Sequence, residues 1–508
     1  MPELAGYFRT HRIAAACLVL VTMVMMGLRT LNLPYSAPWA DQAQFLGYAY
    51  NMAKYATFSV TRRDRPRPDQ MREPGYPVVL AAGLLLHPGI DLDKANAPCV
   101  TEGVDDCLAP VTWLKLVNVL FLGLSAIAVF ATLLALTGNP LLAWIGHLWV
   151  LLSASYAHWA SMFFAEVVVG FLMVALSLRL WRLAGQSPDR RYWFLTGLLL
   201  GALVMVKATF YYLAPLLAVF LAVLVAARRA ATLRESAILG ALFLAGTLAL
   251  TLPWQARNLV STGTASLTGR SGIVLYARAS YDALSFEEHM AAAALFSPSN
   301  SIPERYLSQR WLTPELKEML TGSDNPRDRA FARAGELRDQ TKFGTLSPEV
   351  DAILKKEALH HMIEHWRGHL RATLVFGWRG LFGERGLGFV RAGDGSSTIG
   401  QEAFGLNLGR WILSYPVTAT AALFLPAFLA FFFCVATGRW PYVLLMVPAA
   451  YLYALQALMT HYIPRYSAPL IPMLIVISLV TLAAVLGWLG GRLSNLLGRP
   501  SIEAESRG

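Results

Sequence analysis

The sequence predicts an all-α membrane protein that crosses the lipid bilayer about ten times. Of its 508 residues, 56% are hydrophobic and only 15% are charged, and the mean hydropathy is +0.46. A soluble domain carries about 25% charged residues. Many apolar runs are about 20 residues long, which is the length of a helix that spans a bilayer. Arginines lie in short loops beside these runs, as orientation in a membrane requires.

Ten segments have the length and composition of spanning helices. They are residues 13–32, 111–136, 140–158, 163–184, 192–207, 210–227, 236–255, 411–436, 440–459 and 466–489. The apolar stretch 75–88 is too short to span, so we expect it to lie in the interface or dip into the membrane. A cleaved signal peptide is the less favoured reading of the first segment, because that segment is long.

The arginines between these segments orient the chain. With ten crossings they all fall on one side, which the positive-inside rule assigns to the cytoplasm. They are Arg9, Arg12, Arg179, Arg182, Arg190, Arg191, Arg228, Arg229, Arg234, Arg439, Arg492 and Arg499. This pattern accounts for the net charge of +11, so we expect no nucleic-acid partner.

The predicted topology divides the chain into four parts. They are an N-terminal transmembrane module, 1–255, with a first extracytoplasmic loop, 33–110; a second such loop, 256–410; C-terminal transmembrane helices, 411–489; and a cytoplasmic tail, 490–508. Helical spacing in the second loop predicts amphipathic helices that form a cap on the membrane face. These lie near 284–297, 303–321 and 347–370, with an interfacial helix near 369–390.

Asp41 follows the first span and precedes Phe45, Tyr48 and Met52 at helical spacing. It would therefore open a helix, where the positive end of the helix dipole favours an ionised carboxylate. Such a group can accept a proton from a substrate hydroxyl or amine. The alternative is a helix cap with no catalytic part, because aspartate is a favoured N-cap.

Glu166 and Lys207 interrupt apolar sequence at the start of the fourth span and the end of the fifth. Ionisable groups at membrane depth are costly and point to function. One interpretation is a single site with an anionic ligand near Lys207, and the other is a structural ion pair, perhaps between these two residues.

Three further residues can bind an anion on the same face. Arg72 opens the stretch 75–88, and His461 and Arg465 link the last two spans. A guanidinium offers planar, bidentate donors that match a phosphate. The alternatives are a snorkelling side chain for Arg72 and an interfacial anchor for the His461–Arg465 segment.

Two other residue patterns were weighed. Cys99 and Cys107 lie in an outer loop and form a disulfide or stay free thiols, whereas Cys17 and Cys434 are core residues. His361, His365 and His369 are spaced like metal ligands, but lack an acidic or cysteine set, which favours the solvated face of a helix. We expect no metal site and no cofactor, and dependence on a divalent metal stays open.

Seven short elements, in this order, make the chain resemble the GT-C superfamily of integral-membrane glycosyltransferases. The resemblance is to the protein mannosyltransferases and lipid A aminoarabinose transferases, glycosyltransferase family 39. The matching residues are Asp41; Arg72, Pro74, Gly75, Tyr76 and Pro77; Glu166; Gly197, Leu198, Gly201 and Lys207; Pro253, Trp254, Arg257 and Asn258; Gly272 and Tyr276; and Arg465, Tyr466, Pro469 and Pro472. Alanine replaces the family's serine before Glu166 and its proline after Lys207.

The resemblance implies an inverting transfer of a sugar from a polyprenyl-phosphate donor on the extracytoplasmic face. It implies Asp41 as the general base, and Lys207 and Arg465 as the holders of the lipid phosphate. Arg72, Arg257 and His461 would support the phosphate, and Glu166 would orient Lys207 or the acceptor. The aminoarabinose transferases carry a soluble region after their last helix, whereas the large loop of this chain lies between the seventh and eighth spans. A glycan, a lipid and a protein therefore all stay open as acceptors.

The competing function is a transporter or flippase of a lipid-linked or anionic substrate. A transporter would place its charges near the membrane midplane, often within inverted repeats. No such repeat is visible, and the charges gather at one face. We therefore expect a multi-pass enzyme of a bacterial inner membrane, with membrane lipids around it and its site on the periplasmic or extracellular face. The sugar and the oligomeric state are not encoded in any motif.

Overall fold

A computed structural model describes residues 12–31, 41–61, 66–87, 89–92, 108–185, 189–297, 302–323, 325–341, 347–381 and 416–496. Within these ranges, helices are the regular elements. Cys99 and Cys107, and with them the predicted disulfide, lie outside the described residues.

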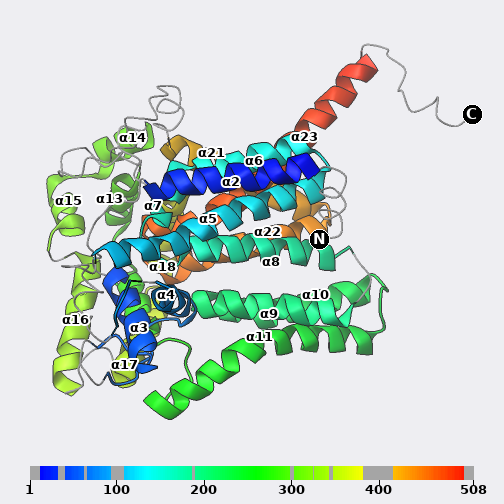
Figure 1. Cartoon of the computed structure of the whole chain (residues 1–508). Helices are drawn as coiled ribbons and strands as arrows, with labels where there is room; N and C mark the ends of the chain where they lie inside the picture. Colours follow the sequence, from blue (N-terminus) through cyan, green and yellow to red (C-terminus); the bar gives the residue numbers. More distant parts are fainter. Residues whose placement is uncertain are drawn as a thin grey trace, which may run out of the picture.

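Among the described residues, a bundle helix overlaps each of the ten predicted spans, and these helices run side by side (Figure 1). They are α2 (Arg12–Leu31), α5 (Leu108–Thr137), α6 (Pro140–Leu152), α8 (Glu166–Leu183), α9 (Arg190–Val206), α10 (Leu213–Ala227), α11 (Leu233–Thr262), α21 (Pro416–Ala436), α22 (Trp440–Met459) and α23 (Ile471–Leu496). Short elements α7 (Ala154–Ala160), η3 (Ala208–Tyr212) and η4 (Pro464–Leu470) join some of them.

Five helical segments of the described chain are long and apolar enough to cross a membrane. They are Trp113–Thr137, Ala208–Ala227, Leu233–Thr262, Trp440–Met459 and Arg465–Leu489. The shorter helices α2, α6 and α21 have apolar stretches below that length. A membrane protein with several crossings is thus supported, and the number ten stays a prediction.

Small residues let the bundle helices approach closely. A Cβ on Gly197 of α9 would lie 1.8 Å from the carbonyl oxygen of Phe243 in α11, so only glycine fits there. The hydroxyl of Thr247 donates to the carbonyl of Gly197 at 3.0 Å, across the same interface. Between apolar helices, such close packing and interhelical hydrogen bonds replace the hydrophobic driving force that water would provide.

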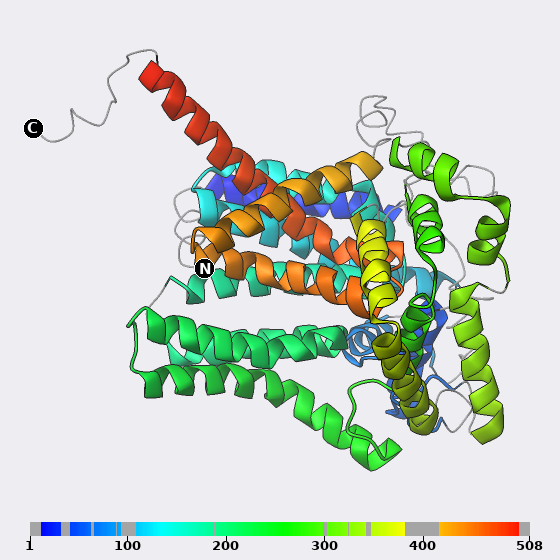
Figure 2. The same cartoon turned by 180° about the vertical axis from the view of Figure 1, so that it is seen from behind.

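One end of the bundle is covered by the remaining helices (Figures 1 and 2). They are α3 (Asp41–Tyr55), α4 (Gly75–Leu85), α12 (Ser271–Ala279), α13 (Phe286–Phe296), α14 (Ile302–Trp311), α15 (Pro314–Thr321), α16 (Pro326–Thr341), α17 (Pro348–Glu364) and α18 (Trp366–Leu381). We call this end the site end. Helices α8 and α23 begin there, and α9 and α22 finish there.

The helices of the second loop follow the predicted segments with more breaks than expected. The segment 303–321 divides where Thr313 caps α15 and Pro314 takes its first position. Proline is preferred at that position, because it has no N–H to leave unbonded. The expected interfacial helix 369–390 is described as far as Leu381, where α18 ends. Its position relative to a membrane stays a prediction.

The histidines at helical spacing correct one expectation. His369 does not lie on a solvated face, because its Nδ1 is 3.0 Å from Oδ2 of the buried Asp282. His361 and His365 are stacked, with ring centroids 4.6 Å apart. Spacing alone cannot distinguish these settings, because the partner of His369 comes from the turn between α12 and α13, far away in the sequence.

Candidate functional site

A chain of four alternating charges lies at the site end of the bundle. Arg72 and Arg465 each donate through Nη2 to one carboxylate oxygen of Asp41. Nε of Arg465 also lies 3.5 Å from Oε1 of Glu166. The order is therefore Arg72, Asp41, Arg465, Glu166, and we call these four residues the ionic chain. It joins residues from four separate parts of the sequence.

Helix α3 places Asp41 at the junction with the bundle. Asp41 is the first residue of this helix, as predicted, so the helix dipole favours its ionised form. The next residue, Gln42, accepts a hydrogen bond from the backbone N–H of Phe163 at 3.0 Å, just before α8. One turn later, the rings of Phe45 and Tyr76 pack edge to face, with their centroids 5.1 Å apart. These contacts fix the start of α3 against α4 and α8.

Arg72 is buried and held by a residue that the sequence interpretation did not identify. Oε1 of Gln44 accepts from both Nε and Nη2 of Arg72, at 2.9 and 2.5 Å. The guanidinium also lies 5.0 Å from the ring centroid of Phe45. Gln44 is three residues after Asp41, so the two share a face of α3. That spacing is the signal that could have identified it.

Arg465 comes from η4, between the last two bundle helices. Its guanidinium lies 4.4 Å from the ring centroid of Phe164, immediately before α8. Helix α8 approaches η4 closely, since a Cβ on Gly170 would lie 3.4 Å from the carbonyl oxygen of Pro469. Glu166 opens α8 as predicted, and its ion pair is with Arg465, not with Lys207.

Lys207 ends α9 beside this ionic chain. Its ammonium lies 4.9 Å from the ring centroid of Tyr466, the ring against which Arg465 also packs. Oε1 of Glu73 accepts from the N–H of Ala208 at 3.2 Å, which ties the segment of Arg72 to the end of α9. Among the described residues, the Lys207 ammonium pairs with no carboxylate.

The electrostatics favour an anion at this place. Burial opposes ionisation of Asp41, but the charges of Arg72 and Arg465 outweigh it and lower the pKa of Asp41 below its usual value. Lys207 lies beside the two carboxylates and two guanidiniums of the ionic chain, and the carboxylate of Glu73 bonds to the N–H of the next residue, Ala208. In a region of low dielectric, a cation that no described carboxylate contacts attracts an anion more strongly than it would in water.

His461 adds no charge. Burial, helped by repulsion from neighbouring arginines, lowers its pKa to about 3, so the imidazole is neutral at physiological pH. Its Nδ1 is buried without a hydrogen-bond partner among the described residues, and its carbonyl accepts from Arg379 at 3.2 Å. A neutral ring can orient a ligand through one hydrogen bond, and support of a phosphate by His461 stays a prediction.

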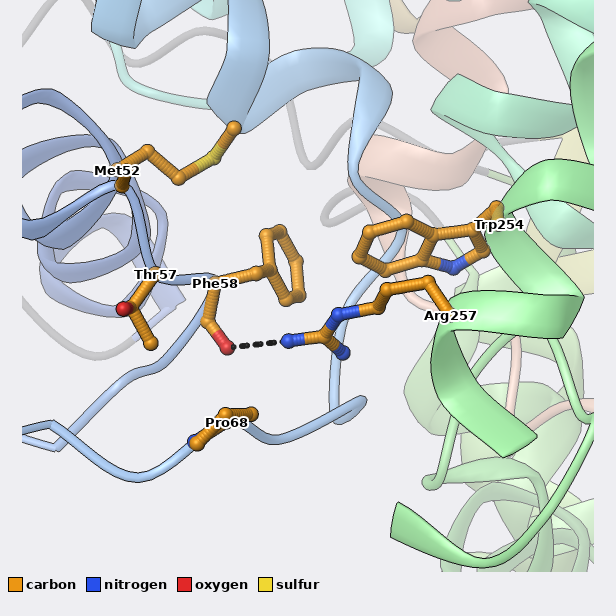
Figure 3. A pocket seen from close by; sticks show the side chains of 7 residues that line it. Met52, Thr57, Phe58, Pro68, Trp254 and Arg257 are labelled. Carbon is orange, nitrogen blue, oxygen red and sulfur yellow. Dashed lines mark hydrogen bonds between the residues drawn. The ribbon is translucent and has the colours of Figure 1, made fainter. Parts of the chain in front are cut away.

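Arg257 lies apart from the ionic chain. Its guanidinium donates to the carbonyls of Asp69 at 2.6 Å and Phe58 at 3.1 Å, which ties α11 to the segment after α3. The carboxylate of Asp69 accepts a hydrogen bond from the hydroxyl of Tyr48. A cavity of about 480 Å³ lies beside Arg257 and is lined by Met52, Ala56, Thr57, Phe58, Pro68, Trp254 and Arg257 (Figure 3).

The ionic chain can perform two tasks together. A carboxylate that stays ionised can accept a proton from a hydroxyl, because two guanidinium bonds leave lone pairs on its oxygens. Arginine and lysine can hold the oxygens of a phosphate. Among the described residues, no group of three or more histidine, cysteine, aspartate or glutamate side chains could hold a metal ion.

Comparisons with known proteins return structures but no sequence match. No protein-family model and no curated protein matches the chain. The archaeal oligosaccharyltransferase AglB from Archaeoglobus fulgidus, in complex with an inhibitory peptide and a dolichol-phosphate, aligns over 97% of this chain with 13% identity and a TM-score of 0.46. The chain covers 53% of AglB, so it spans about half of that protein.

ArnT from Cupriavidus metallidurans also aligns, and the alignment covers 92% of this chain and about three quarters of ArnT. The structure bound to undecaprenyl phosphate gives 14% identity and a TM-score of 0.37, and the apo structure gives 15% and 0.38. AglB and ArnT are GT-C membrane glycosyltransferases, the superfamily that the sequence motifs resemble. At these scores, what this chain does rests on the geometry of its own site.

Proposed function

We propose that the protein is a membrane glycosyltransferase that moves a sugar from a polyprenyl-phosphate donor to an acceptor on the extracytoplasmic side. One observation carries the proposal: an ionised Asp41 is held between two arginines at the site end, with Lys207 unpaired among the described residues beside them. This arrangement offers a proton acceptor and a phosphate site within one cluster.

The proposed reaction is a single inverting displacement. The acceptor hydroxyl attacks the anomeric carbon, and the bond from that carbon to the phosphate oxygen breaks. The hydroxyl proton goes to Asp41, and the polyprenyl phosphate leaves with the bonding electron pair. A carboxylate of low pKa is a weak base, so the proton moves late, once the attacking oxygen has become acidic.

The cations stabilise the leaving group. As the bond breaks, negative charge grows on the phosphate, and fixed donors in a site that excludes water stabilise that charge most. Lys207 is the first candidate, because no described carboxylate competes for it. Arg465 and Arg72 serve both Asp41 and the phosphate, and Glu166 keeps Arg465 in place.

A transporter or flippase would be expected to place these charges elsewhere. Substrate and ion sites of secondary transporters lie near the bilayer midplane. Here Asp41 and Glu166 open their helices and Lys207 ends one, so the charges lie at helix ends. That position suits a substrate held at the lipid–water boundary. We place it on the periplasmic or extracellular face of a bacterial inner membrane.

The test is transfer by the purified protein in detergent. A radiolabelled polyprenyl-phosphate sugar is incubated with extracted envelope lipids and glycans, and label that leaves the polyprenyl phosphate for a new product is measured. We expect Asp41→Asn to lower kcat/KM at least about 100-fold, the usual scale for loss of a general base. The same assay with a chelator, and with added Mg²⁺, decides whether a metal takes part.

Asp189→Asn is the matched control. Asp189 caps the other end of α9 and accepts from the N–H of Arg191 at 3.0 Å, and asparagine caps a helix equally well. Transfer at the wild-type rate by Asp41→Asn would overturn Asp41 as the base. Movement of the donor across sealed vesicles with no new covalent product would favour the flippase.

A further inference from the structure

The cavity beside Arg257 has the composition of a binding site for an amphipathic anion. Its volume of about 480 Å³ lies in the range of small-molecule pockets, which is about 300–1,000 Å³. Figure 3 shows Trp254 and Arg257 on one side, with Met52, Thr57 and Phe58 facing them. Among the described residues, one cation, the hydroxyl of Thr57 and apolar or aromatic groups line the space, and no carboxylate does.

The charge of Arg257 is not neutralised by a described carboxylate in direct contact. Its hydrogen bonds go to the carbonyls of Asp69 and Phe58 and to the side-chain oxygen of Asn258. A guanidinium has five N–H donors, so two remain after these three bonds. The carboxylate of Asp69 is occupied by Tyr48 and by backbone N–H groups, and burial raises its pKa. Arg257 can therefore offer a forked pair of donors to an anion.

The length of α11 is consistent with a cavity at the depth of lipid head groups. Arg257 is about 36 Å from Leu233 along α11, at about 1.5 Å per residue. The hydrocarbon core of a bilayer is about 30 Å thick, and the polar layers extend it to about 40–45 Å. Leu259 and Val260, one turn further on, are 54% and 89% exposed. Such apolar side chains suit contact with lipid, so the cavity borders the surface that lipids would cover.

The cavity is separate from the ionic chain. Asp41 opens α3, whereas Met52 lies near its end, about 16 Å along the helix. We propose that this cavity binds the phosphate of an anionic membrane phospholipid, through Arg257, with Phe58 and Trp254 against the apolar part of the molecule. The ligand is a bilayer lipid and not the polyprenyl-phosphate donor. The proposal does not depend on the transfer reaction.

The test measures lipid retention by the purified full-length protein, using native mass spectrometry in detergent. The probes are phosphatidylglycerol, phosphatidylcholine, a polyprenyl phosphate and glycerol phosphate. We expect phosphatidylglycerol to bind the wild type at least about ten-fold more tightly than phosphatidylcholine. The reason is that a hydrogen bond to a charged group contributes about 1.5 kcal/mol or more to binding, which corresponds to a factor of about ten in affinity. Arg257→Gln should abolish the difference, and Arg257→Lys should keep part of it.

Arg257→Gln also removes the hydrogen bonds to two carbonyls and could disturb folding. A second variant that keeps Arg257 therefore separates loss of binding from loss of structure. Met52→Trp fills the cavity and leaves Arg257 in place, and it should lower phosphatidylglycerol affinity by a similar factor. Arg67→Gln is the control, because Arg67 is exposed beside the cavity residue Pro68. Equal affinity of wild type and Met52→Trp would overturn the proposal. So would displacement of the lipid by glycerol phosphate, or a preference for polyprenyl phosphate at Arg257.

Discussion

Two arginine–aspartate clusters at the site end have opposite designs. In the ionic chain, the side chain of Asp41 is 24% exposed and is shared by two arginines. In the second cluster, Arg278 pairs with Asp282, and both side chains are fully buried. The first cluster leaves a carboxylate within reach of a ligand. The second leaves no exposed polar surface, so its contribution must be to the fold.

The hydrogen bonds of the second cluster explain why it is closed. Arg278 donates to the carbonyls of Ala457 and His369 at 3.4 and 3.0 Å, and to the hydroxyl of Thr373 at 2.9 Å. It thereby joins α12, α18 and α22, and His369 takes the other oxygen of Asp282. An ion pair of the same two residue types therefore stabilises the fold where four of the five guanidinium N–H donors are bonded within the protein. The same kind of ion pair can form a binding site where the carboxylate stays partly exposed, as Asp41 does.

The largest expected effect is on stability, in the closed cluster. Asp282→Asn leaves Arg278 buried without a countercharge, which should lower the free energy of unfolding by about 3–5 kcal/mol. The measurement is thermal or denaturant unfolding in detergent. Transfer per folded molecule should stay near the wild-type value. A large loss of transfer in protein that remains fully folded would erase the distinction between the clusters.

Next in size is the effect of Lys207 on transfer. Lys207→Gln removes the unpaired cation beside the ionic chain and should lower kcat/KM for the polyprenyl-phosphate sugar about 10–100-fold, the scale of a hydrogen bond to a charged group. Stability should change little, because no described carboxylate loses a partner. Lys317→Gln, on the exposed helix α15, is the matched control. Equal kinetics of the two variants would remove Lys207 from the phosphate site.

The pH dependence should be weaker still. The pKa of Asp41 is lowered, so its ion pairs contribute stability above the unfolded value of about 4 and lose it only as pH falls through the lower folded value. The pKa of His461 is about 3. Neither group titrates between pH 5 and 8, so kcat/KM should show no acidic limb there. A limb with an apparent pKa near 6 that vanishes in His461→Gln would contradict a neutral His461.

The smallest effect should come from a third arginine cluster, which is partly exposed and lies on the outer helices. Arg333 lies 2.9 Å from Glu357 and 3.3 Å from Glu336, on the outer helices α16 and α17. Solvent-exposed pairs contribute about 0–1 kcal/mol. Arg333→Gln should therefore change the unfolding free energy by no more than that, and transfer not at all. A larger loss would mean that exposure is a poor guide to the role of these pairs.

Much of the fold was readable from local pattern. Apolar runs predicted the bundle helices, and Asp41 and Glu166 were predicted to open α3 and α8, as they do. Lys207 was predicted at the end of a helix and is the C-cap of α9. These features depend on hydrophobicity, spacing and helix dipoles, which involve residues close together in the chain. That is why one sequence was enough to find them.

Pairing was decided only by tertiary structure. Arg465 is more than 400 positions after Asp41 in the sequence and binds its carboxylate. Glu166 pairs with Arg465 and not with Lys207, and no local pattern predicts this pairing. Burial makes His461 neutral, and the hydrogen bonds of Arg257 go to the carbonyls of Asp69 and Phe58 rather than to the ionic chain. Charge, residue type and helix position belong to the sequence. Partner, exposure and protonation depend on which helix ends pack together.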